Sequence, residues 1–222
     1  MISIGNDIIS LNDIDIIRTK QSKFYSKILT GAEIELYEEQ ATGRLPFEIY
    51  TWLYWSVKES AYKYLQRITP LLLFSPSKFI VNHLQYPLVN RIMVDQTQLT
   101  QGCGFKDEAV YETIINYGEN KLYGSSLINQ DFIFSVVHSN QNFDKICWGV
   151  KLIDNPGTEH QSAAVRKFAI EKLRIYFKTV NISIDKSPYG YPTVIKDDKE
   201  VKIPLSLSHH GHRVAYSFQT GL

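Results

Sequence analysis

The chain has 222 residues and a mass of 25.6 kDa, a length that allows one large domain or two small ones. Its 44% hydrophobic and 21% charged residues are ordinary for a globular protein and exclude a disordered or collagen-like chain. The 24 Lys and Arg residues balance 23 Asp and Glu residues, so no overall positive field attracts nucleic acid. Any charged partner must therefore be recognised by a local patch.

Three features favour a cytoplasmic protein. Residues 1–12 lack the cationic lead into a long apolar run that a secretory signal has. The densest apolar stretch, 71–74, is far shorter than the ~20 residues that span a bilayer, so we expect no membrane partner. Cys103 and Cys147 are too few for a disulfide framework and lack the paired spacing of a zinc site, which fits a reducing compartment.

The first quarter of the chain predicts a strand followed by a basic helix. Residues 1–11 alternate around isoleucines and are broken by Gly5-Asn6-Asp7, which predicts a short strand that opens into a loop at Asp7. Residues 13–25 place apolar residues at helical spacing with basic residues between them. We therefore expect Asp7 at a strand end and a basic helix after it.

Two further helices are predicted before residue 66. Thr30, followed three residues later by Glu33, is a capping-box pattern that opens a helix, and 43–46 is a turn signal. Residues 47–65 contain no Gly or Pro and repeat apolar residues at three- and four-residue steps, which is the strongest helical pattern in the chain. This helix carries Lys58, Glu59 and Lys63.

The rest of the chain mixes strands and helices without regular alternation. Strands are predicted at 79–81, 91–94 and 112–116, a loop around Gly102 and Gly104, and two strands joined by a polar turn within 132–152. A linker is predicted at 155–158, followed by a helix at 163–177, strand-like Ile182, a turn at 187–190, a strand at 192–195 and a closing strand at 214–218. This pattern favours an α+β fold.

One short motif occurs twice. Ser135-Val-Val-His138 is echoed by Ser206-Leu-Ser-His209, and each is followed by a polar stretch and a strand. The echo indicates two related modules whose matching strands pair about a pseudo-two-fold axis. We place the modules at residues 1–154 and 158–222.

Three charged side chains can form a phosphoryl-transfer site. Asp7 and Glu59 are carboxylates that a fold can bring to one Mg²⁺, which prefers one or two protein carboxylates with phosphate oxygens and water. Glu59 and Lys63 are four residues apart and share a helix face. A carboxylate for metal beside an ammonium for phosphate suits phosphoryl transfer. A solvated ion pair is the commoner meaning of this spacing and stays open as the alternative.

The segment Ser208-His209-His210-Gly211-His212 holds three of the six histidines. Its spacing allows zinc ligation, although no neighbouring cysteine completes a site. A Gly-containing turn that presents imidazoles and backbone N–H groups to a phosphate is equally compatible with it. A Ser208 nucleophile with His209 as base is disfavoured, because adjacent residues on an extended backbone face apart.

Together, these segments resemble the motifs of the 4′-phosphopantetheinyl transferases. Gly5-Asn6-Asp7 and the Trp55 to Lys63 helix resemble the family's Gly-x-Asp and Trp-x-x-Lys-Glu-Ala-x-x-Lys motifs. Tyr189-Gly-Tyr-Pro192 and Ser206-Leu-Ser-His-His-Gly211 resemble Gly-Lys-Pro and Asn-x-Ser-His-Ser-Gly. The order of the motifs is that of the small single-module holo-acyl-carrier-protein synthases, but the chain is longer. We therefore expect a synthase-like chain enlarged to two modules.

The chain departs from the family pattern at four positions. Tyr191 replaces the Lys of Gly-Lys-Pro, which removes a cation near the nucleotide. Ile9 stands where many two-module members have a second metal-binding Glu, which leaves magnesium with fewer protein ligands. Ser206 and Ser60 replace an Asn and an Ala. Water can complete a magnesium shell, so none of these changes excludes activity.

The resemblance implies transfer of 4′-phosphopantetheine from coenzyme A to a serine of an acyl or peptidyl carrier protein, in fatty acid or secondary metabolite biosynthesis. Asp7 and Glu59 would hold magnesium, Lys63 would neutralise the diphosphate, and Glu59 would accept the serine proton. The residues implied at coenzyme A are Ser208, His209, Lys58, Gly190 and Pro192. A chain with both modules would be a monomer with one site in the cleft between them, and its basic helix would meet an acidic carrier-protein helix.

Two other functions stay open. The departures fit a non-catalytic module that binds coenzyme A or a carrier protein, although the retained Asp7, Glu59 and Lys63 argue against it. A magnesium phosphohydrolase is the third possibility, for which no second acidic cluster is evident. His138 is expected to have a structural role.

Overall fold

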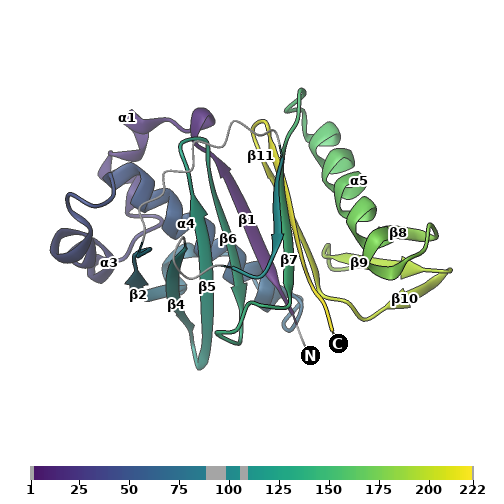
Figure 1. The fold of residues 1–222 in the computed structure, drawn as a ribbon. Coiled ribbons are helices and arrows are strands. Elements are labelled where there is room, and N and C mark those ends of the chain that lie inside the picture. Colours follow the sequence, from purple (N-terminus) through teal and green to yellow (C-terminus); the bar gives the residue numbers. More distant parts are fainter. Residues whose placement is uncertain (1–2, 89–98, 106–109, 222) are drawn as a thin grey trace.

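The computed structural model describes residues 3–88, 99–105 and 110–221. Its main layers follow one another as helix, sheet, sheet and helix (Figure 1). Helix α4 (Phe47–Gln66) covers a five-stranded sheet, and helix α5 (Thr158–Phe177) covers a four-stranded sheet. This mixed arrangement of helices and several sheets is compatible with the predicted α+β class. None of the described helices has both the length and the apolar character needed to cross a membrane.

Both large sheets are antiparallel throughout. The first has the order β1 (Gly5–Ser10), β6 (Phe132–His138), β5 (Asn120–Ile128), β4 (Tyr111–Tyr117) and β2 (Ile80–Gln85). The second has the order β11 (Leu205–His210), β12 (Arg213–Gln219), β7 (Ile146–Leu152) and β3 (Leu99–Cys103). A small sheet of β10 (Lys199–Val201), β9 (Pro192–Lys196) and β8 (Ile182–Lys186) lies beside α5 (Figure 1).

Strand alternation divides the core into three layers. Along β6, Phe134 and Val136 pack between the two sheets, whereas Val137 packs under α4. Along β12, Ala215 faces the first sheet and Tyr216 faces α5. Each large sheet is therefore buried on both faces, which fixes the register of its strands.

The two large sheets meet along their edge strands β1 and β11. The backbone N–H of Asn6 donates to Ser206 Oγ at 2.9 Å, and Asn6 Nδ2 donates to Ser208 Oγ at 2.9 Å. These bonds tie the Gly-Asn-Asp segment to the Ser-His segment across 200 residues of chain. We call this boundary the β1–β11 seam.

The N-terminal helices are shorter than the sequence predicts. Instead of one basic helix over 13–25, the chain forms a 3-10 turn (Leu11–Asp13) and two single-turn helices, α1 (Ile16–Thr19) and α2 (Ser22–Tyr25). Extended backbone at Gln21 separates α1 from α2. The capping box is confirmed, because Thr30 and Glu33 bond reciprocally at the start of α3 (Gly31–Leu36), which continues as a π-helix (Tyr37–Ala41).

Three other boundaries differ from expectation. Gly5-Asn6-Asp7 lies within β1 rather than in a loop after it, and a Cβ at Gly5 would lie 1.9 Å from the carbonyl oxygen of Ser60 on α4. Gly102 lies in strand β3, paired with Trp148, rather than in a loop. Helix α5 starts at Thr158, inside the predicted linker.

The strands predicted near 79 and 112 are β2 and β4, and a 3-10 turn (Pro76–Lys78) precedes β2. The strand predicted at 91–94 lies outside the described residues.

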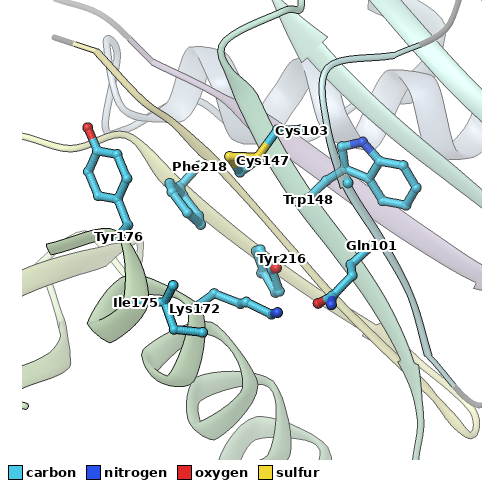
Figure 2. A pocket seen from close by; sticks show the side chains of 10 residues that line it. Gln101, Cys103, Cys147, Trp148, Lys172, Ile175, Tyr176, Tyr216 and Phe218 are labelled. Atoms are coloured by element: carbon cyan, nitrogen blue, oxygen red, sulfur yellow. A yellow bond between two sulfur atoms is a disulfide. The ribbon is translucent and has the colours of Figure 1, made fainter. Parts of the chain in front are cut away.

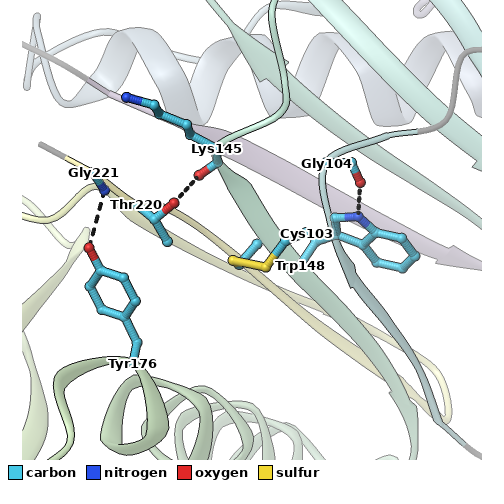
Figure 3. The surroundings of a disulfide bond; sticks show 8 residues. Cys103, Gly104, Lys145, Trp148, Tyr176, Thr220 and Gly221 are labelled. Atoms are coloured by element: carbon cyan, nitrogen blue, oxygen red, sulfur yellow. Dashed lines mark hydrogen bonds between the residues drawn. A yellow bond between two sulfur atoms is a disulfide. The ribbon is translucent and has the colours of Figure 1, made fainter.

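The sequence analysis did not predict that the two cysteines would bond to each other. Cys103 and Cys147 face each other as a registered pair of β3 and β7 and form a disulfide (Figure 2; Figure 3). The neighbouring Trp148 Nε1 donates to the carbonyl of Gly104 at 2.9 Å, which fixes the end of β3 (Figure 3). The two cysteines are 44 residues apart in the sequence, so no local pattern indicates that they pair. The disulfide removes the argument for a reducing compartment, and cytoplasmic location stays a prediction.

Candidate active site

Lys63 joins the two predicted metal-binding carboxylates. Its Nζ donates to Asp7 Oδ1 at 3.2 Å and to the carbonyl oxygen of Asn6 at 3.1 Å, and it lies 3.1 Å from Glu59 Oε1. Glu59 and Lys63 come from one face of α4, whereas Asp7 comes from β1. The close approach of β1 to α4 at Gly5 brings these elements together. We call Asp7, Glu59 and Lys63 the charged cluster.

Burial perturbs the acid–base properties of this cluster. Burial, followed by repulsion from Glu59, raises the pKa of Asp7 to about 7, and Lys63 opposes this shift. Burial alone would lower the pKa of Lys63, but attraction to Glu59 and Asp7 outweighs it and raises that pKa. The second oxygen of Asp7, Oδ2, is buried and has no hydrogen-bond partner within the described structure. An unpaired buried carboxylate oxygen is costly unless a cation or proton occupies it.

The donor set fits one hard cation that completes its shell from substrate. The described residues contain no group of three His, Cys, Asp or Glu side chains arranged to hold a metal. Asp7 and Glu59 provide two carboxylates, and Asp7 Oδ2 has no other partner. Two carboxylates with phosphate oxygens and water are the usual ligands of Mg²⁺. These residues are therefore compatible with magnesium, and the predicted metal role of Asp7 and Glu59 stays a prediction.

Strand β11 brings Ser208 and His209 to the same region. Ser208 is buried at the seam, where its Oγ accepts from Asn6. Partial burial lowers the pKa of His209, Lys63 lowers it further, and Glu59 opposes both effects. His209 therefore lies within the electrostatic field of the charged cluster, and its side chain is exposed.

Lys58 does not reach this region. Its side chain is fully buried on the other side of α4, where Nζ lies 2.6 Å from Glu33 Oε2 and 2.7 Å from the carbonyl oxygen of Ile28. The other oxygen of Glu33 accepts from the backbone N–H of Val81 at 2.8 Å. This contact set ties α4 to α3 and β2, so the structure gives Lys58 a packing role and offers no support for a coenzyme A contact.

Arg67 is a site residue that the sequence reading missed. Its guanidinium donates to the carbonyl oxygens of Pro192, at 2.7 Å, and of Leu205. It also lies 4.9 Å from the ring centroid of Tyr191, in the turn that includes Gly190. Burial lowers the pKa of Arg67 to about 10, which leaves it charged at neutral pH.

The spacing of charged residues along α4 could have indicated Arg67. Glu59, Lys63 and Arg67 recur at four-residue steps, so the last of them continues the charged face of α4. Arg67 thereby connects this face to Tyr191 and to Pro192, which was predicted to lie at the nucleotide.

The other two histidines of the 208–212 segment are used by the fold. His210 Nδ1 accepts from the backbone N–H of Ser10 at 3.0 Å, and His212 Nδ1 lies 3.0 Å from the carbonyl oxygen of Ile153. Gly211, at φ +52°, packs so closely against Asp13 that a Cβ would lie 1.8 Å from its Oδ2. Nothing in this arrangement supports a zinc site.

His138 is also held by the fold. It is buried, with Nε2 at 3.2 Å from Gln219 Oε1 and its ring against Tyr64 and Phe143. These contacts support the structural role expected for His138.

A carboxylate pair beside an ammonium is compatible with the kind of site used for phosphoryl transfer. The family model described as the 4′-phosphopantetheinyl transferase superfamily matches residues 3–99, a span that contains the whole charged cluster. This match confirms the superfamily that the motifs predict and supports phosphopantetheinyl transfer as the general activity. Neither the curated proteins nor the solved structures gave a match.

Proposed function

We propose that the protein transfers the 4′-phosphopantetheine group of coenzyme A to a serine of an acyl or peptidyl carrier protein. The observation that carries this proposal is the charged cluster of Asp7, Glu59 and Lys63, which lies within the matched region. In the reaction, the serine oxygen forms a bond to the phosphorus of the phosphopantetheine. The bond from that phosphorus to the bridging oxygen breaks, and adenosine 3′,5′-bisphosphate leaves.

Each member of the cluster has a distinct task in this proposal. Bound magnesium, held by Asp7 and Glu59, would supply positive charge to the diphosphate. Lys63 neutralises diphosphate charge from its position between the two carboxylates. Glu59, the more exposed carboxylate, accepts the proton of the serine hydroxyl directly or through water. Because burial and Glu59 raise the pKa of Asp7, a bound divalent cation would favour its ionised form.

The β1–β11 seam supports a nucleotide position next to the cluster. We place the nucleotide end of coenzyme A at Ser208 and His209, with the 3′-phosphate against His209. Arg67 offers a cation beside Tyr191, where the family motif has a Lys. In this proposal, Arg67 supplies the positive charge that the Lys of the family motif would supply.

Strand order supports two modules within one chain. Neighbouring strands of the first sheet follow the order β1-β6-β5, and neighbouring strands of the second sheet follow the order β7-β12-β11. Along the chain, β1 precedes α4 and β7 precedes α5, and each of these long helices covers the sheet of the strand before it. This alignment matches β6 with β12 and β5 with β11. It starts the second module at β7, before the predicted boundary at 154–158. It also places the Ser-His echo on strands that do not correspond, since 135–138 is on β6 and 206–209 is on β11.

Mass spectrometry of a carrier protein tests the proposal. The full chain is incubated with coenzyme A, Mg²⁺ and apo forms of an acyl and a peptidyl carrier protein. We expect the carrier to gain the mass of phosphopantetheine. Loss of phosphate from coenzyme A without modification of the carrier would show a phosphohydrolase instead. Binding of coenzyme A without turnover would show a non-catalytic module.

A further inference from the structure

A separate pocket lies between the second large sheet and α5. Its volume is about 420 Å³, within the ~300–1,000 Å³ range of small-molecule sites. Residues of β3, β7, β12 and α5 line it: Gln101, Gly102, Cys103, Cys147, Trp148, Lys172, Ile175, Tyr176, Tyr216 and Phe218 (Figure 2). None of these residues belongs to the charged cluster or to the β1–β11 seam, so the pocket is independent of the proposed transferase site.

Aromatic rings and a covalent crosslink form the apolar body of this pocket. Phe218 stacks with Tyr216 at a centroid distance of 5.9 Å and lies 5.8 Å from the ring of Tyr176. The Cys103–Cys147 disulfide closes the side formed by β3 and β7 (Figure 2). At the rim on α5, Ile175 is 70% exposed. Rings and a disulfide hold their shape, which favours a preformed site for an apolar group.

The polar groups of the pocket gather at one end. Figure 2 shows the ammonium of Lys172, the amide of Gln101 and the hydroxyl of Tyr216 at the same end of the pocket. No Asp or Glu lines the pocket, and no carboxylate of the described residues forms an ion pair with Lys172. An ammonium beside two neutral donors at the end of an apolar pocket is complementary to a carboxylate.

We propose that this pocket binds an amphipathic carboxylate. The apolar body of the ligand packs against Phe218, Tyr176 and the disulfide. Its carboxylate accepts hydrogen bonds from Lys172 Nζ, the Gln101 amide and the Tyr216 hydroxyl. The proposal stands on the geometry of the pocket and does not depend on the transferase reaction.

Two ligands that differ only in charge test the proposal. Isothermal titration calorimetry of the oxidised full chain measures the Kd of 4-phenylbutyrate and of its neutral counterpart 4-phenylbutanamide. We expect the carboxylate to bind about tenfold more tightly, because a charge-assisted bond to Lys172 adds to the shared apolar contact. Lys172→Met should weaken binding of the carboxylate about tenfold and leave binding of the amide unchanged.

Lys167→Met is the matched control. Lys167 is an exposed lysine of the same helix that does not line this pocket, so its loss should change neither Kd. Circular dichroism establishes that each variant keeps the wild-type fold. Equal affinities of the wild type for the two ligands, no saturable binding of 4-phenylbutyrate, or equal effects of the two lysine substitutions would overturn the proposal.

Discussion

Lys63 on helix α4 lies 3.2 Å from Asp7 on strand β1, and its ammonium also contacts Glu59 one helical turn earlier. One ammonium thus contacts both carboxylates that the proposed reaction assigns to a metal ion. A divalent cation that binds Asp7 and Glu59 would either bind beside Lys63 or displace its ammonium from the two carboxylates. Metal binding would therefore depend on the position and charge of Lys63.

The first prediction concerns pH and stability. Because burial and Glu59 raise the pKa of Asp7 from 3.8 to about 7, the folded state holds a proton that the unfolded state releases near pH 4. The free energy of unfolding should therefore fall as pH rises from about 4 to 7, by at most about 1.4 kcal/mol for each unit of pKa difference. Urea unfolding without divalent cations measures this slope.

Asp7→Asn is the control for that slope. The variant cannot ionise at residue 7, so its free energy of unfolding should change less across the same pH range. Mg²⁺ favours the ionised carboxylate and should stabilise the wild type more than the variant at pH 7. Parallel pH profiles and equal Mg²⁺ effects in the two proteins would contradict the account of Asp7.

The second prediction concerns the buried ion pair of Lys58 and Glu33. Lys58→Met leaves the Glu33 carboxylate buried without its partner and should lower the free energy of unfolding by about 3–5 kcal/mol. Adding Glu33→Gln should recover part of this loss. Chemical denaturation of the single and double variants measures both effects. A Lys58→Met protein that is as stable as the wild type but binds coenzyme A more weakly would contradict this account. It would support the coenzyme A contact that was predicted from the sequence.

The third prediction concerns His209 and the 3′-phosphate. His209→Ala should weaken coenzyme A more than its 3′-dephospho analogue, by a difference of about 1.5–3 kcal/mol if His209 makes a charge-assisted bond. Calorimetric titration of both ligands measures the difference. His83→Ala, at an exposed position of β2, is the control and should affect neither. Equal losses for both ligands in His209→Ala would place His209 away from the 3′-phosphate.

The fourth prediction concerns assembly. In the proposed two-module arrangement, β1 contacts β11 within one chain, so no second copy is needed to complete the site. Light scattering should give a molar mass near that of one chain, 25.6 kDa, at all concentrations tested. A concentration-independent trimer would contradict this prediction.

Local patterns predicted the parts of the fold that depend on neighbouring residues. The Thr30–Glu33 capping box and the helix from Phe47 are examples, because their hydrogen bonds and apolar spacing close within a few residues. The split of the basic segment at Gln21 shows the limit of periodicity, since it predicted one continuous helix there.

Contacts between distant segments were not predictable from spacing. The Cys103–Cys147 bond depends on the pairing of β3 with β7, which no local pattern specifies. Glu59 and Lys63 were predicted to share a face, but the contact of Asp7 with Lys63 depends on the packing of β1 against α4. Lys58 was misplaced because its partner Glu33 is 25 residues away in the sequence.

The rate of carrier-protein modification by Glu59→Gln tests the central claim most directly. An amide binds magnesium poorly and accepts no proton, so we expect the rate measured by mass spectrometry to fall about 10²–10⁴-fold with the fold retained. Glu48→Gln, in the first turn of the same helix, removes a surface ion pair with Lys20 and should keep the wild-type rate. Modification by Glu59→Gln at the wild-type rate would contradict the account.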